Sequence, residues 1–72
     1  MQEEIQALIA AQFDDATINV EVDGNRATIA VVSPRFAEMN RVKRQQAVYA
    51  CINDMIADGR LHAVTIKADT PA

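Results

Sequence analysis

The stretch RLHAVTIK, residues Arg60–Lys67, decides the fold, and the rest of the chain can be built outward from it. It predicts a short β-strand that begins at Leu61. Asp58 and Gly59 come directly before it, where a left-handed glycine would end a preceding helix. The only histidine of the chain, His62, lies at the start of this strand. If the protein has a chemical site, we expect it there.

Two earlier segments predict a β-hairpin. Residues Thr17–Val22 alternate between apolar and polar side chains, which is typical of a half-buried strand. The turn Asp23–Asn25 contains glycine and asparagine, which tolerate positive φ, and Ala27–Val32 supplies the return strand. Because a tight turn pairs the strands that it joins, these two strands are expected to be antiparallel neighbours.

Two helices complete the pattern, one over residues 2–13 and one from Arg41 to about Ala57. Asn40 is a suitable cap for the second helix, and Ser33 and Pro34 begin the connector that leads to it. The first apolar helix face comprises Ile5, Leu8, Ile9 and Phe13, and the second comprises Val48, Tyr49, Cys51, Ile52, Met55 and Ile56. Phe36 and Met39 are expected to pack the connector against the core.

These elements predict an α+β fold with the order α-β-β-α-β. A helix between two strands is a crossover, which is right-handed and makes the last strand parallel to the second. The result is a three-stranded mixed sheet with both helices packed on one face and the other face partly open. We expect a single domain over residues 1–72, with a loose tail from Asp69 to Ala72.

Composition favours a folded, cytoplasmic protein. Half of the 72 residues are apolar, and the net charge of −3 disfavours nucleic acid or an anionic membrane as the general partner. No apolar run is long enough to span a bilayer, and Met1 is not followed by a secretion signal. The single cysteine cannot form an internal disulfide. No phosphate-binding loop or nucleophile–base set is present, so no enzymatic activity is expected.

Three segments together resemble the BolA family, most closely its IbaG branch. They are VSPRF at residues 32–36, NRVKRQQAVY at residues 40–49 and LHAVTIKADTP at residues 61–71. The resemblance covers nearly the whole chain and implies a class II KH-like fold. It also implies partnership with a monothiol glutaredoxin, a bridging 2Fe-2S cluster shared with glutathione, and a role in iron–sulfur trafficking and iron homeostasis. Some family members act instead as DNA-binding transcriptional regulators of the stress response.

His62 matches the cluster-ligand histidine of the family. Imidazole replaces cysteine on one iron in some 2Fe-2S clusters, so the chemistry is sound. The glutaredoxin cysteine and glutathione would supply thiolates. The alternative is an inert, hydrogen-bonded histidine at a strand end. A strand beginning at Leu61 puts His62 on the same side as Val64 and Ile66, but we expect its position at the rim of the sheet to leave it accessible to solvent.

Arg26 departs from the family pattern. It falls at the hairpin position where the resemblance implies a second ligand, and arginine has no lone pair to donate. The nearby Asp23 carboxylate suits a soft cluster poorly. The cluster is then bound more weakly, completed by another group, or absent from the complex. Arg26 would instead contact the acidic surface of the partner or the carboxylates of glutathione.

Other candidates have simpler interpretations. Cys51 is predicted to be a buried structural cysteine and not a thiolate ligand. Phe36 and Tyr49 are predicted core residues. The basic residues Arg41, Lys43, Arg44 and Lys67 are candidates for binding nucleic acid. Their alternative is a solvated helix start, and the chain lacks the Gly-x-x-Gly loop with which KH domains clamp nucleic acid.

The sequence therefore predicts a BolA-like, non-enzymatic partner of a monothiol glutaredoxin, with His62 as a candidate cluster ligand. The free protein is expected to be a monomer or weak homodimer. The alternative function is that of a DNA-binding regulator that uses the basic start of the second helix.

Overall fold

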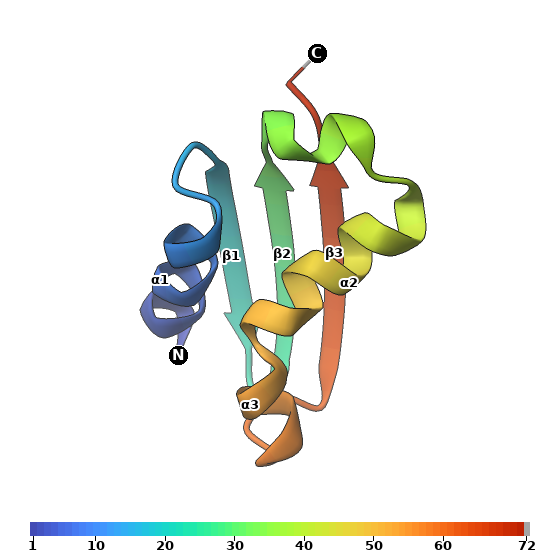
Figure 1. The fold of residues 1–72 in the computed structure, drawn as a ribbon. Coiled ribbons are helices and arrows are strands. Elements are labelled where there is room, and N and C mark those ends of the chain that lie inside the picture. Colours follow the sequence, from blue (N-terminus) through green and yellow to red (C-terminus); the bar gives the residue numbers. More distant parts are fainter. Residues whose placement is uncertain (72) are drawn as a thin grey trace.

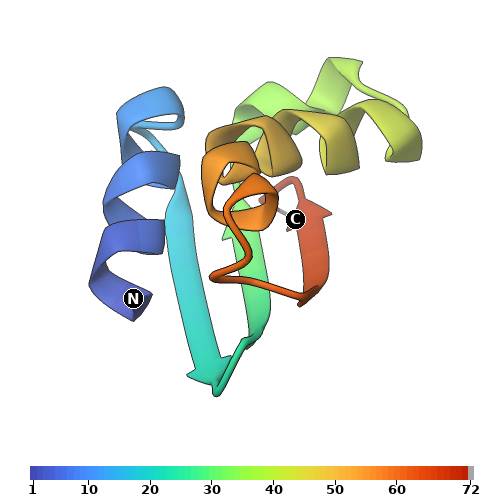
Figure 2. The same cartoon turned by 90° about the horizontal axis from the view of Figure 1, so that it is seen from below.

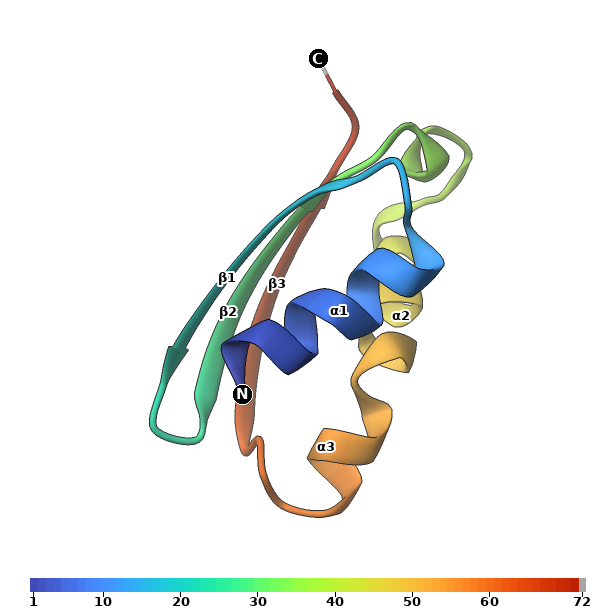
Figure 3. The ribbon, with the colours of Figure 1, turned by 90° about the vertical axis from the view of Figure 1, so that its left-hand side faces the viewer.

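A three-stranded sheet is covered on one face by helices in the computed structural model, which describes residues 1–71 (Figure 1). The elements are α1 (Gln2–Gln12), β1 (Thr17–Asp23), β2 (Arg26–Val32), the 3-10 helix η1 (Pro34–Glu38), α2 (Arg41–Cys51), α3 (Asn53–Ala57) and β3 (Ala63–Asp69). The side view separates the two layers, with the curved sheet on one side and α1, α2 and α3 on the other (Figure 3). The predicted α+β class and the placement of the helices on one face are confirmed.

The sheet has the predicted mixed topology. Its strand order is β1-β2-β3, with β1 and β2 antiparallel and β2 and β3 parallel. The hairpin turn is shorter than predicted, because Asp23 and Arg26 already pair across it and only Gly24 and Asn25 remain between the strands. Gly24 has φ +62°, the left-handed region that glycine adopts without steric cost.

The connector after β2 is held by a buried serine. Ser33 is 0% exposed, and its Oγ donates to Asp15 at 3.1 Å while accepting from the N–H of Arg35 at 3.2 Å. Its own N–H donates to the carbonyl of Asp69 at 3.0 Å. Because a buried hydroxyl must be hydrogen-bonded, this residue joins three segments at one end of the sheet. Asp69 therefore belongs to β3, and the predicted loose tail is wrong at this residue. Ala72 lies outside the described residues.

The long helix predicted from Arg41 to Ala57 is wrong at one position. Ile52 has φ −118° and ψ 14°, which interrupts the helix and separates α2 from α3. The change of direction allows Ile52, Met55 and Leu61 all to be buried at 0–1% exposure. The Asn40 cap is confirmed, since its side chain accepts a hydrogen bond from the N–H of Lys43 at 2.9 Å.

The last strand begins later than predicted. Leu61 and His62 lie before β3, which starts at Ala63. The N–H groups of His62 and Ala63 both point to the carbonyl of Asn25, at 2.8 and 3.4 Å. The hairpin turn therefore holds this segment before regular pairing with β2 begins. The predicted alternation does not apply to His62, because it is not part of the strand.

The core fills the space between the sheet and the helices, which the view along the sheet shows from one end (Figure 2). Its buried members are Ile5, Ile9, Phe13, Val20, Ala27, Ile29, Val31, Phe36, Val48, Ile52, Met55, Leu61 and Ile66. Two predicted core residues differ. Leu8 is 38% and Tyr49 is 40% exposed, because each lies at the edge of its helix face and not at its centre.

Candidate functional site

His62 lies in the loop between α3 and β3, and its side chain is exposed. Leu61 precedes it, is 1% exposed, and donates its N–H to the carbonyl of Met55 at 3.1 Å. His62 itself is fixed through its N–H, which donates to the carbonyl of Asn25 at 2.8 Å. The backbone is thus held on both sides, while the imidazole is left in solvent at the end of the sheet.

Gly59 follows the end of α3 and lies close to this imidazole. It has φ +87°, a conformation in which any residue with a Cβ is strained. A Cβ built at Gly59 would lie 4.0 Å from Nε2 of His62. That separation is an ordinary van der Waals contact, so the backbone conformation, and not lack of space, requires glycine here.

Arg60 ties the histidine loop to the start of α1. Its Nη1 lies 3.0 Å from Oε2 of Glu4, and its Nε lies 2.9 Å from Oδ2 of Asp58. Hydrogen bonds to Glu4, and then to Asp58, raise the pKa of the Arg60 guanidinium above its usual value. Exposed pairs of this kind contribute little to stability. Burial of Leu61 is therefore the main anchor of the loop.

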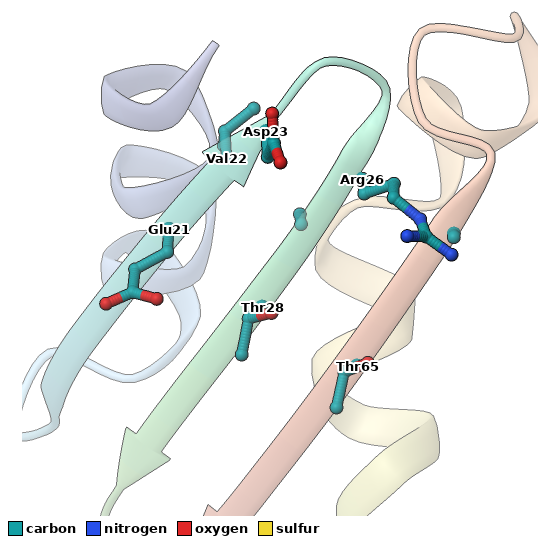
Figure 4. A pocket seen from close by; sticks show the side chains of 8 residues that line it. Glu21, Val22, Asp23, Arg26, Thr28 and Thr65 are labelled. Carbon is teal, nitrogen blue, oxygen red and sulfur yellow. The ribbon is translucent and has the colours of Figure 1, made fainter.

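A shallow depression of about 530 Å³ opens on the bare face of the sheet beside this loop. Figure 4 shows the side chain of Arg26 extending from β2 over β3, the strand that carries Thr65. Arg26 is the register partner of Ala63, the residue after His62. The structure therefore brings Arg26 and His62 to the same end of the sheet.

Among the described residues, the donor atoms near His62 are too few to form a metal site on their own. Residues 1–71 contain no group of three or more histidine, cysteine or carboxylate side chains that could hold a metal ion. His62 is an accessible nitrogen donor, but Arg26 has no lone pair to add. The chain fits a metal cluster only if another molecule provides the remaining ligands.

Cys51 belongs to a different part of the molecule. It is half-buried, not fully buried as predicted, and lines a groove between α1 and α2 with Leu8 and Phe13. Its thiol contacts the carbonyl of Ala47 at 3.5 Å. Burial raises the pKa of the Cys51 thiol, which lowers the thiolate fraction at neutral pH. A structural role remains the simpler interpretation.

The basic candidates do not form one surface. Arg41 and Lys43 are exposed in the first turn of α2. Arg44 is half-buried, and its Nε donates to the carbonyls of Phe36 and Met39, both at 3.0 Å. Lys67 alternates with the buried Ile66 on β3 and so faces away from the helices. Arg41 and Lys43, two positions apart in the first turn of α2, are the exposed pair among the four candidates in this helix and β3.

Sequence reasoning missed two parts of this region. Arg60 was not predicted to hold the loop, because its partner Glu4 is 56 positions away and no local pattern links them. The depression on the sheet was also missed. The strand alternation that placed Glu21 on the polar side, together with Thr28 and Thr65, could have indicated it.

Fold and site together define a small α+β domain that presents one histidine at the open end of a mixed sheet. None of the helices within residues 1–71 is long and apolar enough to cross a membrane. Residues 19–72 match the family model described as BolA-like protein. The chain belongs to the BolA family, as its motifs predicted.

Similar protein sequences and a similar solved structure agree with this family assignment. Acid stress protein IbaG of Escherichia coli strain K12 is 42% identical over 69 residues, which cover 96% of this chain and 82% of that protein. An uncharacterized protein in the rpoN-murA intergenic region of Acinetobacter guillouiae is 40% identical over 94% of this chain and 82% of that protein. BolA1 from Arabidopsis thaliana matches with a TM-score of 0.86 at 25% identity, over 97% of this chain and 90% of that one.

Proposed function

We propose that this protein is a non-enzymatic, cytoplasmic partner of a monothiol glutaredoxin in iron–sulfur trafficking and iron homeostasis. His62 would donate one ligand to a 2Fe-2S cluster that the two proteins share. The observation that carries the proposal is the exposure of His62 on a loop whose backbone is fixed on both sides. BolA-family membership supports the choice of partner.

The donor count explains why a second protein is needed. A 2Fe-2S cluster takes four protein or thiol ligands, and histidine can replace cysteine at one of its irons. This chain offers one exposed imidazole at the site, so the glutaredoxin cysteine and glutathione would supply thiolates. The cluster is then cargo held between partners and not a resident cofactor of this chain.

Reconstitution is the direct test. The protein is mixed with a monothiol glutaredoxin, iron, sulfide and glutathione, and the visible circular dichroism is recorded. A heterodimer whose cluster spectrum differs from that of the glutaredoxin alone supports the proposal. A spectrum identical to that of the glutaredoxin alone, with no heterodimer on gel filtration, would contradict it.

Arg26→His is expected to add a second protein ligand. Arg26 lies beside the loop of His62, so an imidazole there would approach the same cluster. We expect an altered visible spectrum and at least about tenfold slower loss of the cluster to a chelator. Arg26→Gln is the matched control, because it removes the charge without adding a soft donor. An unchanged spectrum and unchanged lifetime for Arg26→His would show that position 26 does not face the cluster.

The alternative function is DNA binding through the start of α2, which the two exposed cations Arg41 and Lys43 favour. If each contacts one phosphate, the logarithm of the affinity should fall with the logarithm of salt concentration with a slope of about −2. Arg41→Ala and Lys43→Ala should each reduce that slope by about 1, whereas Lys67→Ala, on the opposite side, should leave it unchanged. Fluorescence anisotropy at several salt concentrations measures this. A slope near zero would exclude the alternative.

A further inference from the structure

The open face of the sheet carries charges of both signs that have no partner within the described chain. Glu21 and Asp23 stand on β1, and Arg26 stands on β2 (Figure 4). In residues 1–71 every side-chain ion pair involves Arg60, so these three groups remain free. All three line the depression of about 530 Å³ on this face.

The charges are separated across the strands. Asp23 and Arg26 are register partners, yet the guanidinium of Arg26 extends away from β1 and lies over β3 (Figure 4). Neighbouring strands are about 4.8 Å apart, so the carboxylates on β1 and the cation over β3 are roughly 10 Å apart. Thr28 and Thr65 lie two residues farther along β2 and β3, in the cross-strand row of Glu21, whereas Asp23, Arg26 and Ala63 form the row next to the turn.

We propose that this depression binds a short peptide with free amino and carboxyl termini, about three residues long. An extended chain spans about 3.3–3.6 Å per residue, so three residues cover roughly 10 Å. The ammonium group would be attracted to the carboxylates of Glu21 and Asp23 on β1, and the carboxylate would contact Arg26. The hydroxyl group of Thr28, the register partner of Glu21, would bond to a peptide amide between the termini.

The layout of charge selects a zwitterion over a simple ion. An anion on Arg26 would gain only the attraction of the guanidinium, and a cation on β1 would gain only the attraction of the carboxylates. Only a ligand with both charges at the right separation satisfies both ends. This proposal does not depend on the cluster, because His62 lies in the loop before β3 and does not line the depression.

Triglycine tests the proposal without a metal or a second protein. We expect saturable shifts of the backbone amide signals of Glu21, Thr28 and Thr65 in ¹⁵N-correlated NMR spectra, with a dissociation constant on the order of 1 mM. N-acetyl-triglycine and triglycine amide, which each lack one charge, should bind about fivefold more weakly. Equal affinity for all three peptides, or shifts located elsewhere, would overturn the proposal. Absence of any shift at about ten times the expected dissociation constant would do the same.

Variants identify which charge meets which terminus. Arg26→Gln should weaken triglycine about fivefold but leave triglycine amide unchanged, because the contact that it removes is already absent. The double variant Glu21→Gln, Asp23→Asn should likewise weaken the binding of triglycine but leave that of N-acetyl-triglycine unchanged, because this peptide has no ammonium group to lose a contact. His62→Ala should bind triglycine as the parent protein does. Loss of binding in His62→Ala would move the ligand to the histidine loop and overturn the assignment, whatever the outcome of the cluster experiment.

Discussion

Replacing His62 with alanine is expected to abolish the visible circular dichroism contributed by the heterodimer with glutaredoxin. Mutations of groups that only support a ligand already cost about 10–100-fold in metal affinity, so loss of the ligand itself should cost at least as much. The side chain is exposed, so truncation should change the free energy of unfolding by no more than about 0.5 kcal/mol. The defect would therefore be one of coordination and not of folding. Visible circular dichroism of the reconstituted mixture and urea unfolding of the free protein measure the two effects separately.

Two matched substitutions make this result specific. His62→Cys offers a thiolate at the same place and should restore a cluster with a changed spectrum, since thiolate is the usual ligand of such clusters. Cys51→Ser should have no effect, because Cys51 lines the groove between α1 and α2 and not the histidine loop. If His62→Ala retained the parent spectrum while Cys51→Ser lost it, the ligand would be the cysteine and the proposed site would be wrong.

The fold was predictable because each element has a local cause. The alternation in Thr17–Asp23, the glycine in the hairpin turn and the Asn40 cap are all visible without tertiary contacts. The break at Ile52 was not predictable, because the α2 and α3 sequences form one continuous apolar pattern. In the structure Ile52 leaves the helical conformation and is buried together with Leu61 from the next loop, a tertiary contact that no local pattern reveals.

The site was predictable in its main residue but not in its geometry. His62 was identified because it is the only imidazole and follows a helix end. Its exposure at the sheet margin was expected and is confirmed, although a strand that began at Leu61 would have put it on the same side as Val64 and Ile66. In the structure the N–H of His62 donates to the carbonyl of Asn25, and β3 begins only at Ala63, two residues later than predicted. That contact joins segments 37 positions apart, as their numbering shows.

Phe36→Ala is expected to lower the free energy of unfolding by about 3–5 kcal/mol. Phe36 is 0% exposed, and its ring centroid lies 5.1 Å from that of Phe13, so the truncation leaves a cavity between η1 and α1. At about 0.05–0.15 kcal/mol per residue, a domain of this size has a total stability of only about 4–11 kcal/mol. The variant should therefore unfold at a much lower urea concentration, with its unfolding slope unchanged.

Tyr49→Ala is the matched control, because it truncates an aromatic residue that the sequence also assigned to the core. Because Tyr49 is 40% exposed, its truncation removes much less buried surface, and we expect the free energy of unfolding to change by no more than about 1 kcal/mol. Equal losses for the two variants would mean that Tyr49 packs in the core as Phe36 does, which would contradict the prediction. Unequal losses would confirm that the connector holds the helical layer.

Phe36 and Met39 provide the carbonyls that bind Arg44, so loosening η1 would also release that guanidinium from the backbone. An Arg44 freed in this way would join Arg41 and Lys43 as a third free cation, so Phe36→Ala should bind DNA with a steeper salt dependence than the parent if the alternative function is correct.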